Sequence, residues 1–423
     1  MKLTTEVLVI GSGITGAGIL WDLSLRGIDA ILVEQYDPAY GATGRCHGLL
    51  HSGCRYLIQD SDVALECYRE NQILRRIAGK AIENTGGYFV YLPGDDYEYL
   101  KQWVKVARRL KIPVEEIGVH EARQKEPLLS ERISRVFWVP DAVVDPFELV
   151  WMNIRGAVQR GARVLNQTRV IQLVIEGERV RGAILENTQT GEKYKVEAQI
   201  VVNAAGSWAA KIAAMAGIHL NMAYGRGTIL VFAQRLTARV INRLRYPGDG
   251  DILVPAGSIS LFGTTDVPTS DPDDLCPTAE EIKYLLALGD DLIPGLTQRR
   301  ILRAYAGIRP LYSGINSDIS GREVPREFAV LDHGRIDHLK GFFSIVGGKL
   351  TTYRLMAEQA VDLIARELGI SKPCTTMEEP LPEPVITLPH LPMGDSSLIC
   401  ECEQLRKKTS KKLLKRSILR LVT

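Results

Sequence analysis

The stretch that decides the fold lies at the N-terminus, where residues 6–16 read Glu6-Val7-Leu8-Val9-Ile10-Gly11-Ser12-Gly13-Ile14-Thr15-Gly16. The apolar run predicts a buried strand, and residues 17–25 carry apolar side chains at helical spacing. In the Gly-x-Gly-x-x-Gly between them, the first glycine makes a tight turn and the second lets backbone N–H groups approach a pyrophosphate. The third lets helix and strand pack closely. The stretch therefore predicts a Rossmann-like α/β unit that binds a dinucleotide at a helix N-terminus.

A second predicted strand, residues 30–33, leads into Glu34, which follows Gly16 by 18 residues. A carboxylate at this place accepts hydrogen bonds from ribose hydroxyls and disfavours a 2′-phosphate. These features together predict a dinucleotide site, but they do not distinguish FAD from NAD.

Two later stretches bear on the cofactor. Residues 200–206 form an apolar strand that runs into small residues and Gly206, which indicates either a bulky group close to the backbone or a packed strand–helix corner. Residues 347–354 read Gly347-Gly348-Lys349-Leu350-Thr351-Thr352-Tyr353-Arg354. A helix N-terminus beside a lysine would stabilise the negative charge of a reduced flavin, whereas a plain glycine turn is the other interpretation.

Five blocks of sequence, taken in order, resemble the FAD-dependent glycerol-3-phosphate dehydrogenases, within the D-amino-acid-oxidase-like flavoproteins. Besides the fingerprint and the 347–354 block, they are Thr43-Gly44-Arg45-Cys46-His47-Gly48-Leu49-Leu50-His51-Ser52-Gly53-Cys54-Arg55-Tyr56, Gly263-Thr264-Thr265-Asp266 and Ala306-Gly307-Ile308-Arg309-Pro310-Leu311. The Arg45–Gly48 stretch and a late Cys400-Glu401-Cys402-Glu403 are most similar to the large subunit of the anaerobic enzyme.

The resemblance implies FAD as the cofactor and sn-glycerol 3-phosphate as the substrate. The residues that it places at the cofactor are Gly11, Gly13, Gly16, Glu34, Thr43, Arg45, Ser52, Gly206, Gly347, Gly348, Leu350 and Thr351. Those that it places at the substrate pocket are Arg55, Tyr56, Arg326, Lys349 and Thr352, besides His51 and Arg309. The residue types agree, since a dianionic phosphate needs several fixed cationic donors.

The implied reaction is oxidation of sn-glycerol 3-phosphate to dihydroxyacetone phosphate, with hydride transfer from C2 to flavin N5. His51 is the first candidate for the base that takes the hydroxyl proton, because an imidazole titrates near working pH. Arg309, as a group that stabilises the developing alkoxide, is the second, and a purely structural His51 is an alternative. Cys46 and His47 lack further ligands at suitable spacing, which favours packing over a metal pair or a covalent flavin anchor.

Two other functions stay open at this stage. The same fold would suit an FAD-dependent amine, amino-acid or 2-hydroxy-acid oxidase or dehydrogenase. A flavin-binding protein that serves as an idle scaffold is the second alternative. For the main hypothesis, electrons would pass to quinone directly or through partner subunits.

The domain organisation follows from the same patterns. We expect a discontinuous FAD-binding domain from residues 1–80, 145–222 and 335–370, with a mixed or antiparallel-sheet substrate domain inserted at 81–144 and 223–334. Residues 371–423 would be a Pro-rich linker, a truncated iron–sulfur-type stub and a basic tail. Cys400 and Cys402 are only half of a [2Fe–2S] site, which needs four thiolates or equivalents. No metal site is therefore expected in this chain.

The charge distribution sets the tail apart. Residues 406–423 hold eight Lys and Arg and no acid, so the rest of the chain is mildly acidic and argues against a nucleic-acid partner. The tail is read either as a truncated end or as a basic amphipathic segment on anionic lipid. No apolar run reaches the ~18 residues of a membrane helix, and no secretory signal is present. With seven scattered cysteines, this predicts a cytoplasmic location, with peripheral attachment at the inner membrane face as an option.

Overall fold

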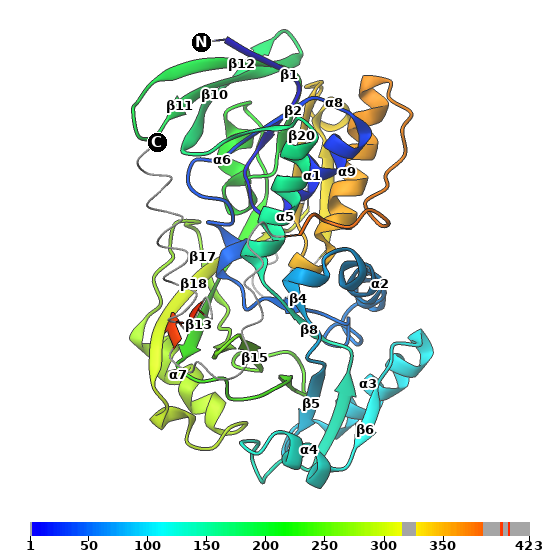
Figure 1. Cartoon of the computed structure of the whole chain (residues 1–423), viewed down its shortest axis with the longest axis vertical. Helices are drawn as coiled ribbons and strands as arrows, with labels where there is room; N and C mark the ends of the chain where they lie inside the picture. The colour runs from blue at the N-terminus through cyan, green and yellow to red at the C-terminus, as the bar shows by residue number, and fades with distance from the viewer. Residues whose placement is uncertain (1, 315–326, 384–397, 401–404, 407–423) are drawn as a thin grey trace.

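The computed structural model describes residues 2–314, 327–383, 398–400 and 405–406. Two large sheets lie at opposite ends of the long axis of the molecule (Figure 1). A third, small sheet has three strands in the order β3 (Leu49–Leu50), β8 (Ala142–Val144) and β4 (Ile82–Glu83). The chain crosses from one large sheet to the other several times, so each end is assembled from segments far apart in the sequence.

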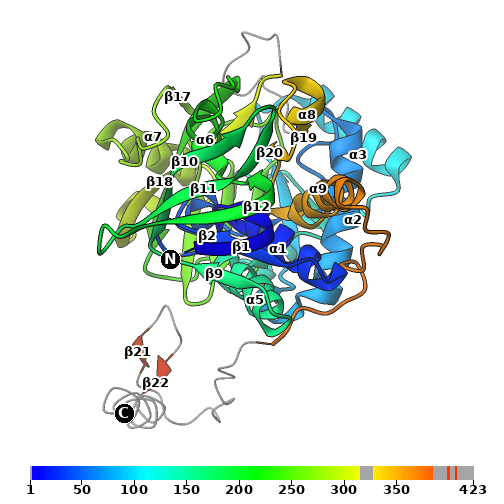
Figure 2. The ribbon, with the colours of Figure 1, turned by 90° about the horizontal axis from the view of Figure 1, so that it is seen from above.

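The first sheet has a parallel centre in which β1 pairs with both β2 and β12, β2 pairs with β9, and β12 pairs with β20. Figure 2 shows this sheet from above, with the β10–β11 hairpin continuing it beyond β12. Its strands are β1 (Lys2–Ile10), β2 (Ala30–Val33), β9 (Arg163–Leu165), β10 (Thr168–Glu176), β11 (Arg179–Asn187), β12 (Lys193–Asn203), β19 (Phe328–Asp332) and β20 (Phe342–Gly347). The central strands are buried on both faces, which explains their unbroken Val, Ile and Leu runs.

Three helices pack together on one face of this sheet, namely α1 (Ile14–Arg26), α5 (Pro146–Gln159) and α9 (Tyr353–Leu368). Glycines allow the close approach on both sides of α1. A Cβ at Gly18 would lie 2.8 Å from the Tyr353 ring, and a Cβ at Gly156 would lie 2.6 Å from the Trp21 ring. The opposite face is covered by α6 (Ala209–Ala214) and by the strands that extend the sheet.

The second sheet is mixed and largely antiparallel, in the order β17-β13-β16-β15-β14-β5-β7-β6, with β18 also paired to β13. Its strands are β5 (Gly87–Tyr91), β6 (Glu115–Ile117), β7 (Arg135–Val139), β13 (Met222–Phe232), β14 (Val240–Arg243), β15 (Ile252–Ala256), β16 (Ile259–Gly263), β17 (Val267–Thr269) and β18 (Ile301–Tyr312). Helices α3 (Tyr97–Leu110), α4 (Val119–Lys125) and α7 (Ala279–Asp290) accompany it, as Figure 1 shows.

A buried ion pair joins α9 to α2 (Ser61–Ile77). Arg354 donates from Nε and Nη2 to both carboxylate oxygens of Glu70, at 2.8 and 2.6 Å, and both side chains are almost fully buried. The ion pair between Arg163 and Asp29, at 2.7 Å, is instead exposed to solvent, since both side chains are more than a third exposed. Arg354 also donates to Thr376 Oγ1 at 3.0 Å, which fastens the described part of the Pro-rich segment to this unit.

Most elements expected from the sequence are found, and one differs. The sequence pattern predicts strands over residues 6–10, 30–33 and 342–346 and a helix over 278–288, and all four are present. The Thr278 side chain caps α7 in a capping box. The pattern of residues 62–84 predicts a helix over that whole stretch, which is wrong for residues 78–84. Helix α2 ends at Ile77, a short turn follows at Gly79–Ala81, and the next two residues form β4 against β8. Pairing with a distant strand therefore overrides the helical pattern there.

The proposed domain boundaries remain a prediction. The strands of the first sheet come from residues 2–33, 163–203 and 328–347, and those of the second from 87–139 and 222–312. Strand β19, which the sequence places in the inserted domain, pairs with β20 in the first sheet. None of the described helices combines the length and apolar character that a bilayer-spanning segment needs.

Candidate active site

A cavity of about 450 Å³ lies at the carboxyl ends of β1, β2 and β12. We call it the glycine cavity, because Gly11, Gly13, Gly206, Gly347 and Gly348 line it. The carboxyl ends of adjacent parallel strands form the usual ligand site of open α/β sheets, since helix N-termini converge there. The first helix begins at Ile14, whose N–H donates to Thr43 Oγ1 at 3.1 Å.

Three glycines of the fingerprint are needed for different reasons. Gly11 has φ +102°, and a Cβ on it would lie 2.7 Å from the Ala204 carbonyl oxygen. At Gly13 a Cβ would contact Thr43 Oγ1 at 3.3 Å. Gly16 does not line the cavity; a Cβ there would lie 1.9 Å from the Gly11 carbonyl oxygen. Gly11 is thus a turn position and Gly16 a packing position, whereas the approach of a pyrophosphate to Gly13 stays a prediction.

Glu34 follows β2 and lines the glycine cavity. Its Oε2 accepts hydrogen bonds from the Ser12 N–H and hydroxyl, at 2.9 and 3.0 Å, and its Oε1 accepts from the Tyr36 N–H at 3.0 Å. Hydrogen bonds from Ser12 and Tyr36 therefore hold the Glu34 carboxylate in one orientation at the cavity wall.

A second cavity, of about 540 Å³, lies beside the first and reaches the second sheet. We call it the arginine cavity, because Arg45, Arg55 and Arg309 line it. Its other walls include Tyr246, Pro247 and Gly248. Six residues line both cavities and form the junction between them: Ala42, Cys46, His47, His51, Tyr56 and Arg309. A ligand in one cavity would therefore lie next to a ligand in the other.

Arg309 is fixed at this junction by the Gly263–Asp266 block. Its Nη1 donates to Asp266 Oδ1 at 2.9 Å, and its Nη2 donates to the Thr265 carbonyl at 2.9 Å and to Thr264 Oγ1. The guanidinium lies over β13, where a Cβ at Gly227 would be 2.6 Å from Arg309 Nη2. The Gly263–Asp266 block therefore holds the Arg309 guanidinium in one place. The sequence did not predict this contact between the two blocks.

Burial and nearby cations disfavour the charged form of the two histidines at the junction. Burial, the nearby His47 and the positive charges of Arg55 and Lys349 hold the pKa of His51 well below its ordinary value of 6.5. Burial, with Arg309 and Arg55, lowers the pKa of His47 to about 3. A neutral imidazole has one ring nitrogen that accepts a proton.

Aromatic and cationic groups surround His51. Its ring lies edge-on to that of Tyr56, with centroids 5.3 Å apart, and Lys349 Nζ lies 5.0 Å from the centroid of the Tyr56 ring. The backbone N–H of His51 donates to Thr351 Oγ1 at 3.2 Å. The 347–354 block and the 43–56 loop, about 300 residues apart, thus meet at one point, where they line the glycine cavity together.

The structure groups most of the predicted site residues but not all. Those that line the glycine cavity are Gly11, Gly13, Glu34, Thr43, Gly206, Gly347, Gly348, Lys349, Leu350 and Thr351. Arg55 lines the arginine cavity, and His51, Tyr56 and Arg309 line both. Arg326 lies outside the described residues, as does Cys402; Cys400 ends β21 (Leu398–Cys400), which pairs with β22 (Leu405–Arg406).

Besides Gly16, which packs behind the turn, three predicted residues lie elsewhere. Arg45, expected at the cofactor, lines the arginine cavity and donates to the Tyr40 carbonyl at 3.1 Å. Ser52 is buried behind the cavities, where its N–H and hydroxyl donate to Asp141 Oδ1 at 2.8 and 2.7 Å. Thr352, expected in the substrate pocket, is also buried, and its hydroxyl donates to the Lys349 carbonyl at 3.3 Å. Ser52 and Thr352 support the loops that carry the cavity residues.

Several site residues were not found from the sequence. Asp266 and Gly227 position Arg309, and Asp141 anchors the 51–56 loop. Burial raises the pKa of Asp141, although the hydrogen bonds from Ser52 oppose this. The only local sequence signal for these positioning residues was the Gly263–Asp266 block, in which Asp266 follows two threonines. Within the described ranges, no group of three or more His, Cys, Asp or Glu side chains could hold a metal ion.

Comparison with known proteins assigns most of this chain to one protein family. Residues 6–354 match the family model described as "DAO: FAD dependent oxidoreductase". The chain is 43% identical to one subunit of the anaerobic glycerol-3-phosphate dehydrogenase of Escherichia coli (strain K12), over 95% of this chain and 79% of that protein.

Solved structures have the same fold. The glycerol-3-phosphate dehydrogenase from Bacillus halodurans, complexed with FAD, superimposes with a TM-score of 0.66 at 26% identity, covering 88% of this chain and 67% of that one. The L-proline dehydrogenase from P. horikoshii has a TM-score of 0.72 at 24% identity, covering 88% and 96% of the two chains, and shows the fold alone.

Proposed function

The chain belongs to the family of FAD-dependent oxidoreductases, and from this premise we propose that it oxidises sn-glycerol 3-phosphate to dihydroxyacetone phosphate. The observation that carries the proposal is the junction of two cavities. One cavity has the walls of a dinucleotide site, and the other is lined by three arginines. Proteins similar to this chain over most of their length are named glycerol-3-phosphate dehydrogenases.

The residues of the glycine cavity fit FAD. The absence of a Cβ at Gly11 and Gly13 leaves backbone N–H groups within reach of a pyrophosphate, and Glu34 offers acceptors for ribose hydroxyls. When bound, FAD supplies the acceptor for the C2 hydrogen and its electron pair. Lys349 and the N-terminal end of α9 lie where positive charge would stabilise an anionic ring system.

The arginine cavity fits the substrate by charge. We assign the phosphate to Arg55, which lines the arginine cavity, and to Lys349, which lines the adjoining glycine cavity. A guanidinium and an ammonium group can together hold a dianion away from C2. Anchoring a remote group orients the reacting carbon and limits its motion. Arg309, fixed by the Gly263–Asp266 block, would stabilise the oxygen of C2 as it loses its proton.

His51 is the group that we assign as the base. In the free site its pKa is well below 6.5 because burial and the cations Arg55 and Lys349 oppose a positive charge. A bound phosphate dianion would offset those cations and raise the basicity of the imidazole. Substrate binding would therefore bring the pKa of His51 toward the working pH, where general-base catalysis is most effective.

Anaerobic reduction of the flavin by sn-glycerol 3-phosphate tests the function directly. The wild-type absorbance should bleach on addition of this substrate. His51→Asn should lower the reduction rate by roughly 10²–10⁴-fold, while the exposed control His120→Asn should not change it. A His51→Asn rate within about threefold of wild type removes His51 from the base role. Reduction by amino acids alone would favour an amino-acid oxidase, and no reduction by any donor would favour an idle scaffold.

The route of the electrons is a separate part of the proposal. The Escherichia coli relative is named as one subunit of its enzyme, which implies partner subunits there. We propose that this chain likewise passes electrons to a membrane quinone through partner subunits, at the cytoplasmic face of the membrane. A quinone analogue added to the substrate-reduced chain should reoxidise it slowly alone and faster with a membrane fraction that holds the partners. Equal rates in the two samples would contradict a role for partners.

A further inference from the structure

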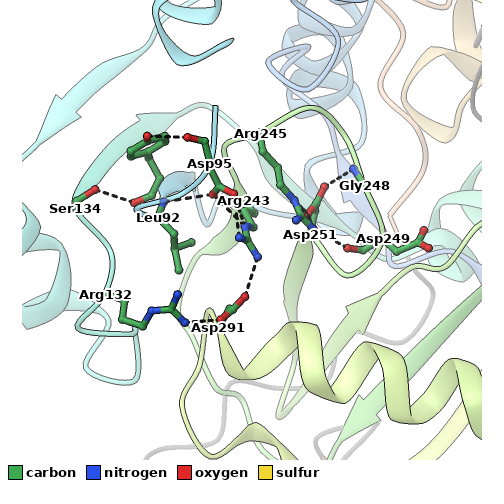
Figure 3. A network of polar contacts seen from close by, with 11 residues as sticks. Leu92, Asp95, Arg132, Ser134, Arg243, Arg245, Gly248, Asp249, Asp251 and Asp291 are labelled. Atoms are coloured by element: carbon green, nitrogen blue, oxygen red, sulfur yellow. Dashed lines mark hydrogen bonds and ion pairs between the residues drawn. The ribbon is translucent and has the colours of Figure 1, made fainter. Parts of the chain in front are cut away.

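The loop of residues 244–251 forms one wall of the arginine cavity and is folded around a buried carboxylate. Asp251 is fully buried. Its Oδ1 accepts from Arg245 Nε at 2.9 Å, and its Oδ2 accepts from the Gly248 N–H at 2.6 Å (Figure 3). Arg245 also donates to the Asp249 carbonyl at 3.2 Å, which closes the loop. The wall residues 246–248 are thus held from behind by Asp251.

The same carboxylate binds an arginine from a different part of the chain. Arg55 Nη2 donates to Asp251 Oδ2 at 3.1 Å and to the Gly248 carbonyl at 3.3 Å. The Arg55 side chain is only 11% exposed, and it lines the cavity that we assign to the substrate. Asp251 itself does not line that cavity. It therefore contacts the cavity only through Arg55 and the wall loop.

The charges of this cluster differ from those of its neighbour. Two guanidiniums, Arg55 and Arg245, share the one carboxylate of Asp251 at the wall. In the adjoining cluster of Figure 3, Arg243 binds two carboxylates, Asp95 and Asp291, and none of the three lines the cavity. The first cluster suits an anion next to it, whereas the second only ties elements of the fold together.

We propose that Asp251 is a positioning residue for substrate binding, which acts by holding Arg55 at the cavity wall where it can bind the phosphate group. The proposal rests on the proposed function, since it assigns the phosphate to Arg55. A long arginine side chain has many rotamers, and a fixed acceptor on one Nη atom restricts them. The rigid guanidinium then binds the dianion without a further loss of side-chain entropy.

Asp251→Asn tests this in the FAD-loaded enzyme. We expect the KM for sn-glycerol 3-phosphate to rise about tenfold or more, because a charge-assisted hydrogen bond loses its orientation. We expect kcat to stay within about twofold, because the reacting groups are untouched. The inhibition constant of inorganic phosphate, used as a probe for the anion site, should rise by the same factor. The dissociation constant of FAD should stay unchanged.

The matched control is Asp95→Asn, which weakens an equally buried arginine–carboxylate pair in the adjoining cluster. It should leave the KM and the phosphate inhibition constant unchanged. A rise in both variants would mean that general loosening of the loop, and not the position of Arg55, sets the affinity. That outcome would overturn the proposal.

A double-mutant cycle separates action through Arg55 from an independent effect. Arg55→Ala alone should raise the KM, and adding Asp251→Asn to it should then change the KM by less than about twofold. Additive effects would contradict the proposal. If Asp251→Asn does not fold, Arg245→Gln replaces it. That variant removes the donor that holds Asp251 Oδ1 at the wall, so it should also raise the KM, and an unchanged KM would overturn the proposal.

The failure of this inference differs from failure of the proposed function. If the wild-type flavin is not reduced by sn-glycerol 3-phosphate, the function is wrong. If the wild type is reduced normally and Asp251→Asn has the wild-type KM and phosphate inhibition constant, only the role of Asp251 is wrong.

Discussion

Replacement of Gly16 by alanine tests the packing on which the cofactor site depends. A Cβ at this position would lie 1.9 Å from the Gly11 carbonyl oxygen, whereas real Cβ contacts are not shorter than 3.0 Å. The blocking atom is backbone, so the first turn of α1 and the Gly11 turn must separate. The Gly11 N–H donates to the Val33 carbonyl at 2.8 Å, and this bond would be strained by the same movement.

Two effects of opposite sign decide the magnitude. Alanine is a better helix former than glycine by ~0.8–1.0 kcal/mol, and Gly16 lies within α1. Overpacking of a close contact costs about 1–3 kcal/mol, and here the contact cannot be relieved by a side-chain rotation. Taking the upper end of that cost for a rigid backbone contact, we expect a net loss of about 2 kcal/mol in the free energy of unfolding. The displaced turn should also weaken FAD binding by roughly 10–100-fold, the worth of one charge-assisted hydrogen bond.

The assays are urea unfolding of the apoprotein and fluorescence titration of the apoprotein with FAD. The control is Gly79→Ala, because no heavy atom lies within 4 Å of a Cβ at Gly79 and its φ is outside the left-handed region. The control should change the free energy of unfolding by less than ~0.5 kcal/mol. The reasoning is refuted if Gly16→Ala binds FAD as tightly as the control does.

Three further predictions concern titration, burial and reactivity. The substrate dianion is itself protonated at about pH 6, so kcat/KM is calculated for the dianion concentration at each pH. Its acid limb should then lie well below pH 6.5, because the free-enzyme pKa of His51 is lowered and the remaining activity falls as pH drops through that value; a limb at or above 6.5 contradicts this. Glu70→Ala removes the bidentate partner of the buried Arg354 guanidinium, which keeps one hydrogen bond to Glu358. The free energy of unfolding in urea should therefore fall by about 3 kcal/mol, the lower end of the cost of breaking a buried ion pair. The exposed-pair control Asp29→Ala should lower it by less than about 1 kcal/mol, and equal effects would refute the argument from burial. Peptide mapping after iodoacetamide at pH 8 should find Cys276, which is exposed, alkylated long before Cys67, because burial raises the Cys67 pKa to about 12; equal rates would contradict this.

Some errors of the sequence analysis came from signals that were present but not used. Helix α5 has Asp145 at its N-cap, accepting from two backbone N–H groups, and Pro146 in its first turn. Both are standard start signals. Other errors had no local signal. The end of α2 at Ile77 depends on pairing of the next residues with β8, about 60 residues further along the chain.

The amino-acid sequence alone determined the dinucleotide fingerprint, its acidic partner Glu34 and, as the class of cofactor, a dinucleotide. These depend on local backbone geometry, because a strand, a glycine turn and a helix are contiguous and each glycine has its own steric reason. The 43–56 and 347–354 blocks were also recognised from residues that are neighbours in the chain.

Only the tertiary structure decided which of those residues meet. Arg309 reaches the junction of the cavities because the antiparallel register of β13 and β18 sets it opposite Gly225. The Gly263–Asp266 block reaches the same place because it begins at the last residue of β16, another neighbour of β13. Thr352 and Ser52 look like site residues in the sequence, yet they are buried behind the loops that they support. The sequence carries no local record of such contacts, because strand register and helix packing are set by the burial of apolar surface over the whole chain.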